Sequence, residues 1–172
     1  LLRAHTALEL LRGRACVNGV AVTDTVLLPG NEGWGSMDRD FAAEAAAMAS
    51  SLAPLAQQVQ AYGGSFLYVG VPEQRSVFRN RYPAGVRSCS DYLDAIGASF
   101  EAAMEEARVP LLLLNDLYEE QDGLTDLYSA TDHHYTLPGA YRAYQAICAA
   151  LRAEGWIFPE VTDEHIRFTQ LE

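Results

Sequence analysis

Apolar residues along this chain fall into two alternating patterns. Recurrence every three or four residues predicts helices over residues 1–12, 40–62, 91–107 and 138–154. Two continuous apolar runs, "SFLYVGVP" from Ser65 and "VPLLLLND" from Val109, are typical of strands buried on both faces. Because these strands alternate with helices, the pattern predicts an α/β fold with a parallel sheet and right-handed crossovers.

Turns and buried faces can be predicted in the same way. The dipeptide Asn18-Gly19 predicts a β-hairpin between the first two helices, and Pro29-Gly30-Asn31 marks a second break. The Ala-rich helix over residues 40–62 is expected to bury four apolar residues on one side: Met48, Leu52, Leu55 and Val59. The helix over residues 91–107 is expected to bury a similar stripe: Leu93, Ile96, Phe100, Met104 and Ala107. The segment after the last helix is expected to be a short strand or an extended tail.

The composition suits one domain and limits the classes of binding partner. The chain has 172 residues, of which 49% are hydrophobic, so it can bury a core. Its 12 basic and 23 acidic residues give a net charge of −11, which argues against a basic patch for nucleic acid or an anionic membrane. No apolar run approaches the roughly 20 residues of a membrane span. The chain starts without Met, and we therefore expect it to be a piece of a longer protein.

Two polar loops follow the predicted strands, over residues 72–87 and 116–137. Ligands of open parallel sheets bind beyond the carboxyl ends of the strands, where both loops are expected to lie. The second loop contains Asp132 and His134. In an extended loop, residues two apart point to the same side, so the carboxylate could orient the imidazole as in a nucleophilic triad. His133 would then point the opposite way and act in packing or hydrogen bonding.

Other interpretations of this loop remain open. A metal site could use Asp132, His133 and His134 with His165 or His5, although no second clustered pair of ligands supports it. Alternatively, the histidines only cap a helix and satisfy hydrogen bonds. In the first loop, four arginines could line an anionic substrate site or form a solvated face: Arg75, Arg79, Arg81 and Arg87.

The residues after the two histidines favour the start of a helix. Thr136 can cap the helix, and Pro138 is tolerated in its first turn.

The three cysteines predict neither a disulfide framework nor a metal site, because they are far apart and lack the spacing of metal ligands: Cys16, Cys89 and Cys148. Cys148 is expected to be a small core residue.

The stretch "TDHHYTLPGAYRAY", from Thr131, resembles the DHHW motif of the bacterial DHHW family. This family is related to the alginate O-acetyltransferase-like proteins of the SGNH hydrolase superfamily. Tyr135 stands where the motif has Trp. The runs "VNGVAVTDTVLL", "SFLYVGVPEQ" and "VPLLLLNDLYEE" resemble other family segments less specifically. The resemblance implies a single three-layer SGNH-hydrolase-like domain over residues 1–172, incomplete at its C-terminal side.

By this resemblance, Asp132 orients His134 and His134 is the general base. The family places its Gly-Asp-Ser nucleophile after the motif, and no such tripeptide occurs in this sequence. The resemblance therefore implies that this chain alone is inactive, unless a serine elsewhere substitutes. Ser76, Ser88 and Ser90 lie in or near the first loop and are the candidates, whereas Ser65 opens a strand and is expected to be structural.

The function implied by the resemblance is O-acetyl transfer to, or ester hydrolysis on, a cell-envelope or exported polysaccharide. Neither a cofactor nor a metal is expected. The location would be extracytoplasmic, with any membrane anchor outside this chain. Five further residues are candidates for the pocket: His133, Tyr135, Thr136, Gln74 and Arg75. The alternative function is a non-catalytic carbohydrate-binding or scaffold domain that keeps the fold without the nucleophile.

Overall fold

The computed structural model describes residues 2–30, 36–118 and 124–166. Helix α1 (Leu2–Leu11) precedes a small antiparallel sheet of β1 (Cys16–Val17), β2 (Val20–Val22) and β3 (Leu27–Pro29). The predicted hairpin is confirmed, because Asn18 and Gly19 have φ of 53° and 75°, as a two-residue turn of this kind needs. Strand β3 ends at Pro29, near the second break, and Asn31 lies outside the described residues.

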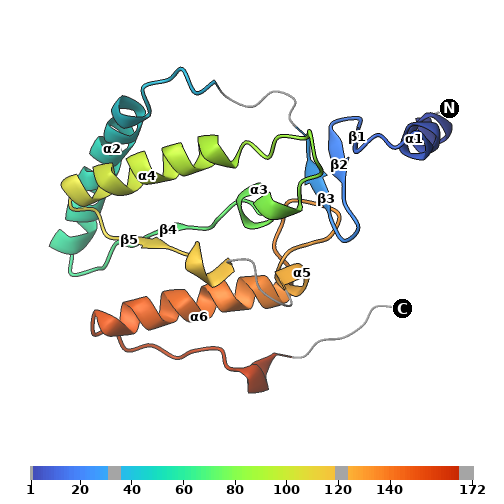
Figure 1. Ribbon diagram of the computed structural model, residues 1–172. Coiled ribbons are helices and arrows are strands. Elements are labelled where there is room, and N and C mark those ends of the chain that lie inside the picture. Colours follow the sequence, from blue (N-terminus) through green and yellow to red (C-terminus); the bar gives the residue numbers. More distant parts are fainter. Residues whose placement is uncertain (1, 31–35, 119–123, 167–172) are drawn as a thin grey trace.

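A second, parallel sheet forms the centre of three layers. Strand β4 (Tyr68–Gly70) pairs with β5 (Leu111–Leu113) in register Tyr68–Leu111 to Gly70–Leu113. Helices α2 (Phe41–Ala61) and α4 (Ser90–Glu106) lie together on one side of this sheet, and α6 (Leu137–Ala153) lies on the other (Figure 1). The predicted three-layer α/β architecture is therefore confirmed.

The two central strands are half-buried, not fully buried as their apolar runs predicted. All six residues of β4 and β5 keep intermediate exposure. Each strand pairs on one edge only within the described part of the chain, so both outer edges of this sheet are open. Continuous hydrophobicity predicted the strands correctly, but full burial would require further neighbours on both sides.

Helix α2 begins and ends where the sequence predicted, but it buries a different face. Asp40 caps its start by accepting a hydrogen bond from the Ala43 N–H at 3.0 Å. The fully buried residues are Ala45, Ala49 and Ala56, whereas two predicted core residues are exposed: Met48 and Leu55. The small alanines allow α2 and α4 to approach closely, which explains why they, rather than the larger residues, form the contact.

Helix α4 packs most of the apolar residues of its predicted stripe against the core. Met104 is fully buried, and Phe100 and Ala107 pack against the same core cluster. Ile96, which the pattern placed in the core, is exposed beside a cavity at the carboxyl end of β4. Ile96 is left exposed because it lines this cavity instead of packing against other side chains.

The segment after β4 departs most from prediction. It was expected to be a polar loop, but it forms α3 (Gln74–Val77) and a 3₁₀ turn, η1 (Arg79–Arg81). Gln74, Arg75, Val77 and Phe78 are all buried. Val77 and Phe78 join the larger core cluster, and this apolar pair holds α3 inside the fold.

The remaining elements complete the sheet's carboxyl end and the tail. They are η2 (Asp116–Tyr118), α5 (Leu124–Leu127), and η3 (Asp163–His165) after an extended stretch. The tail contains no strand within residues 154–166, and residues 167–172 lie outside the description. Cys148 is buried on α6, as predicted. None of the described helices is both long enough and apolar enough to cross a membrane.

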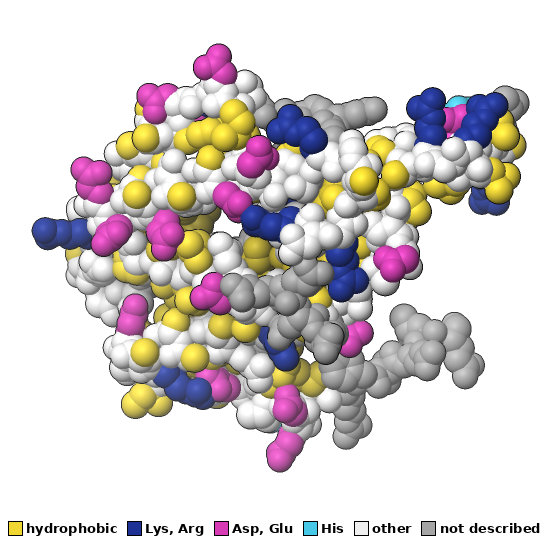
Figure 2. Space-filling model, in the orientation of Figure 1, with side chains coloured by type: hydrophobic (Ala, Val, Ile, Leu, Met, Phe, Trp, Pro, Cys, Tyr) yellow, Lys and Arg dark blue, Asp and Glu magenta, His cyan; other side chains and the backbone are white. Residues whose placement is uncertain are grey.

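Charge on the surface follows the acidic composition. Figure 2 shows Asp and Glu side chains spread over the visible face, with arginines dispersed among them and a group of them at the end where α1 projects. In the sequence at and after the end of α1, Arg12 and Arg14 both form ion pairs with the buried Glu9.

Candidate active site

The Asp-His-His loop is closed at its base by backbone pairing. Tyr128 and Tyr135 form an antiparallel bridge, and the Ser129 N–H donates to His134 O at 2.9 Å. Outside this pair, the Thr136 N–H donates to Leu127 O at 2.8 Å. The loop is therefore a short, closed projection whose base rests on the core through the buried Tyr128.

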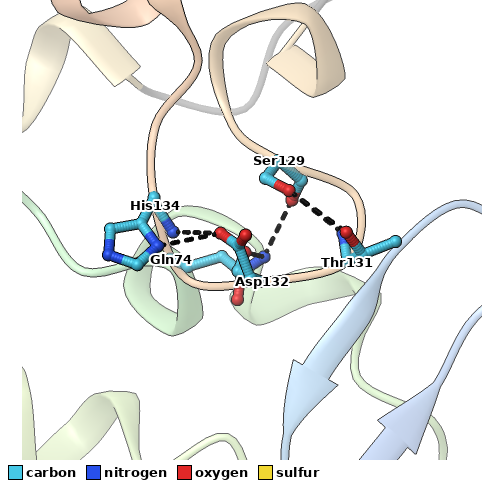
Figure 3. Close-up of polar contacts among 5 residues, drawn as sticks. All are labelled: Gln74, Ser129, Thr131, Asp132 and His134. Atoms are coloured by element: carbon cyan, nitrogen blue, oxygen red, sulfur yellow. Dashed lines mark hydrogen bonds and ion pairs between the residues drawn. The ribbon is translucent and has the colours of Figure 1, made fainter.

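Asp132 and His134 are in contact at the tip of this loop (Figure 3). Asp132 Oδ1 lies 3.1 Å from His134 Nδ1 and also accepts the His134 backbone N–H at 2.8 Å. Both side chains are open to solvent, with relative exposures of 53% and 72%. The predicted contact between the two residues is present.

The loop is not extended, and this corrects the prediction for His133. Because the Asp132 carboxylate accepts the N–H two residues ahead, the backbone bends, and side chains do not alternate as in a strand. The His133 and His134 rings consequently lie side by side, with centroids 4.0 Å apart and planes inclined by 34°. His133 therefore does not point away from its neighbour.

The electrostatics of the pair suit a carboxylate that orients a base. The backbone N–H of His134 is the main cause that holds the pKa of Asp132 below its ordinary value, with the His134 ring adding to it. An ionised Asp132 favours the tautomer with hydrogen on Nδ1, which leaves the lone pair of Nε2 available. Within the described residues, Asp132 is the only hydrogen-bond partner of the His134 ring.

Tyr135 and Thr136 contribute to the base of the loop rather than to its tip. The Tyr135 ring packs edge-on against Tyr128 with centroids 6.4 Å apart. Thr136 caps α6, as predicted, because its Oγ1 accepts the Gly139 N–H at 3.3 Å while the hydroxyl donates to Asp126 O. The loop therefore passes directly into a fixed helix start.

Two candidate pocket residues of the first loop are buried, and one of them, Gln74, contacts the second loop. Gln74 donates hydrogen bonds to backbone carbonyls of the Asp-His-His loop (Figure 3), and Arg75 Nε lies 3.2 Å from Glu73 Oε1. The sequence analysis placed Arg75 either in an anionic substrate site or on a solvated face. Its side chain is buried, which fits neither prediction. At the surface, Arg79 forms a two-pronged ion pair with Asp94 at 2.6 and 2.8 Å.

Tyrosine anchors were missed by the sequence analysis. The Tyr128 hydroxyl donates to Pro72 O at 2.5 Å, and the Tyr118 hydroxyl donates to Gly139 O at 2.6 Å. Burial raises the pKa of both phenols, so both remain donors. The sequence could indicate that these two tyrosines are buried. It could not predict their hydrogen bonds, because the carbonyl partners belong to segments distant in sequence.

A cavity of about 610 Å³ lies at the carboxyl ends of β4 and β5. Its lining includes Gly70, Glu73, Ser76 and Asn115. His134 was expected to face such a cleft, but none of residues 132–135 is among the lining residues of this cavity. Glu73 and Gln74 are adjacent in sequence, so the cavity and the loop meet at the start of α3.

The candidate substitute serines do not form hydrogen bonds with His134 in the described residues. Ser76 lines the cavity, and Ser88 and Ser90 bond to each other with their hydroxyl oxygens 2.8 Å apart. Ser65 bonds to Trp156 and Glu154 at the far end of α6. In the described residues, none of these four serine hydroxyls is therefore a hydrogen-bond partner of the His134 ring.

The other residues considered for a metal site are not gathered at the loop. His165 bonds to Thr162 within η3, with Nδ1 and Oγ1 2.9 Å apart, and His5 belongs to α1. Within residues 2–30, 36–118 and 124–166, no group of three or more His, Cys, Asp or Glu side chains is placed to hold a metal ion.

Comparison with known proteins places the chain among acetyltransferase domains. The family model described as the SGNH hydrolase-like domain of the acetyltransferase AlgX matches residues 28–172. None of the curated proteins matches. Among solved structures, the O-acetyltransferase domain of Pseudomonas putida AlgJ is 21% identical, with a TM-score of 0.63 over 83% of this chain and 50% of that one.

Bacillus cereus PatB1 has a similar fold. Its structure is 18% identical, with a TM-score of 0.61 over 83% of this chain and 45% of that one. A PatB1 structure with a sulfonyl adduct gives 18% identity and a TM-score of 0.60, over 78% and 43% of the two chains. At these identities the likeness establishes the fold, and the chain spans about half the length of the structures it matches.

Proposed function

The chain belongs to the family of SGNH hydrolase-like domains of the acetyltransferase AlgX, and we propose that it takes part in O-acetyl transfer to a polysaccharide. The single observation that carries this proposal is the Asp132–His134 pair, with Oδ1 3.1 Å from Nδ1 on a loop closed at its base. We further propose that the chain belongs to the DHHW branch, with Asp132, His133, His134 and Tyr135 as its motif. The polysaccharide would be exported or part of the cell envelope, and the location extracytoplasmic.

The proposed chemistry is acyl transfer through a serine ester. His134 Nε2 removes the proton of the serine hydroxyl as its oxygen attacks the acetyl carbonyl of a donor ester. The donor alcohol leaves with that proton. A sugar hydroxyl then gives its proton to His134 and attacks the acetyl-serine, and the serine oxygen regains the proton as it leaves.

The serine would come from a Gly-Asp-Ser segment outside these 172 residues, because the sequence contains none. Residues 1–172 would then form the part of an SGNH-like domain that carries the base and its partner. The absence of the tripeptide also favours one alternative, a carbohydrate-binding or scaffold domain that keeps the fold without catalysis. No cofactor has a part in either proposal.

Activity of the isolated chain, compared with that of a longer gene product, separates these functions. We expect the 172 residues alone to show no appreciable hydrolysis of an acetyl ester, because water must then replace the serine as nucleophile. General-base catalysis of that kind is worth only about 10²–10⁴-fold over water. The measurement is the release of acetate from an acetylated model ester and from an acetylated oligosaccharide.

The control is a longer gene product that includes a downstream Gly-Asp-Ser, and it should transfer acetyl groups. Appreciable His134-dependent turnover by the short chain, with a covalent acetyl-enzyme detected by mass spectrometry, would place the nucleophile within residues 1–172 and contradict the divided site. A longer product with the tripeptide but without any His134-dependent turnover would favour the non-catalytic alternative.

A second expected result concerns metal binding. Two or three ligands from one exposed segment give weak chelation compared with the four of a structural zinc site. We therefore expect calorimetric titration with zinc to show no stoichiometric binding at micromolar protein. Tight binding that is lost in His134→Ala would contradict a metal-free role for the loop.

A further inference from the structure

The carboxamide of Gln74 lies beneath the loop that carries Asp132 and His134. Its Nε2 donates to Ser129 O at 3.1 Å and to Asp132 O at 2.7 Å (Figure 3). Gln74 begins α3, and its relative exposure is 1%, so both bonds are formed away from bulk water. The two carbonyls come from a segment more than 50 residues away in sequence.

The chemistry of the amide determines its orientation. A primary amide carries two N–H donors on nitrogen, and these match two carbonyl acceptors three residues apart. With oxygen and nitrogen exchanged, Oε1 would face two carbonyl oxygens, which is repulsive. The Gln74 amide therefore holds this part of the loop bent around its nitrogen.

Other contacts hold the ends of the loop but do not involve the Asp132 backbone carbonyl. The Tyr128–Tyr135 bridge closes the base, and the Leu27 N–H donates to Ala130 O at 2.7 Å. Among the described residues, Gln74 is the hydrogen-bond partner of the Asp132 backbone carbonyl. The half-exposed carboxylate of Asp132 is held by the His134 backbone N–H and ring. Both contacts depend on the Asp132 backbone, which the Gln74 bond holds in place.

The Gln74 side chain also has an unpaired atom. Its Oε1 is buried without a hydrogen-bond partner in the described residues. A buried acceptor without a donor costs stability, so an apolar side chain of similar shape would be no worse for the fold on that account. The amide is thus better explained by its two donated bonds than by packing.

We propose that Gln74 is a positioning residue, which fixes the backbone of Asp132 so that its carboxylate stays against His134. The residue acts through Asp132 and touches no reacting atom. Its effect on catalysis rests on the proposed function, whereas its effect on the geometry of the pair does not.

The test uses Gln74→Met in the full 172-residue chain, since methionine keeps the length and removes both donors without adding charge. Nuclear magnetic resonance would measure amide exchange at His134 and Ser129 and the pKa of the Asp132 carboxyl. We expect exchange at both amides to rise about tenfold, and the pKa of Asp132 to rise toward its ordinary value as the His134 N–H bond loosens. Gln74→Glu, which presents acceptors to both carbonyls, should increase exchange further.

Gln58→Met on the exposed side of α2 is the matched control and should leave both amides unchanged. Wild-type exchange and an unchanged Asp132 pKa in Gln74→Met would overturn the proposal. So would global unfolding of both Gln74 variants, since that would make Gln74 a residue of the fold rather than of the pair. If the longer product lacks His134-dependent transfer while these shifts appear, the proposed function fails and the positioning role stands.

Discussion

His134→Ala should lower acetyl transfer by the complete, serine-containing protein by about 10⁴–10⁶-fold, the range for loss of the base from a nucleophilic triad. The reason is that serine and histidine act as a unit, so a hydroxyl without its base is a weak nucleophile at neutral pH. Asp132→Asn should cost about 10⁴-fold, because an amide favours the wrong tautomer of His134 and cannot stabilise its charged form. The measurement is kcat/KM on an acetyl ester, with circular dichroism to verify folding.

His133→Ala provides the matched control within the same motif. The two histidine rings are neighbours and both residues are exposed, so loss of either removes a similar contact from the loop. The structure gives His133 no bond to Asp132, and we expect its loss to change kcat/KM by less than about threefold. Equal losses in His133→Ala and His134→Ala would mean that the pair of rings, rather than one base, carries the function.

Elements defined by local signals could be predicted well from the sequence. Asp40 and Thr136 accept backbone N–H groups at helix starts, and Asn18-Gly19 adopts positive φ values whatever lies nearby. These preferences act over a few residues, so the sequence alone contains them. The contact between Asp132 and His134 belongs to the same class, because the two residues are separated by one position.

Features that depend on distant segments could not be predicted in this way. The buried face of α2 is set by how closely α4 approaches, and alanines therefore replace the larger Met48 and Leu55 in the contact. Gln74 looked like a pocket residue of a polar loop, yet its carbonyl partners lie more than 50 residues further along the chain. Polarity in a sequence cannot distinguish a solvated side chain from one that is buried with its partners.

The wrong orientation of His133 has a different origin. The prediction assumed an extended loop, in which residues two apart share a side. The structure has a bend closed by the Asp132 carboxylate, and this bend brings the same two residues together by another route. The contact between Asp132 and His134 was therefore predicted correctly from an incorrect backbone conformation. Only the orientation of His133, which lies between them, distinguishes the bent loop from an extended one.

Gly139→Ala is expected to destabilise the protein by about 3 kcal/mol, near the upper end for overpacked sites. A Cβ at Gly139 would overlap the Leu127 carbonyl oxygen and approach Leu127 C and Tyr135 Cβ to 3.1 Å each. A backbone carbonyl cannot rotate away as a side chain can, so α6 or the loop must shift. Leu127 O also accepts the Thr136 N–H, and the Tyr118 hydroxyl donates to Gly139 O, so the shift would strain two further bonds.

The measurement is thermal unfolding, in which a loss of this size should lower Tm by about 6–12 °C for a domain of this length. Gly97→Ala on the exposed side of α4 is the control, because its Cβ would meet no atom within 4 Å. That change should raise stability by about 0.5–1 kcal/mol, since alanine loses less backbone freedom in a helix. If Gly139→Ala matched this gain, α6 would have room to move away from Leu127. The close packing that seats the Asp-His-His loop on α6 would then contribute little to its rigidity.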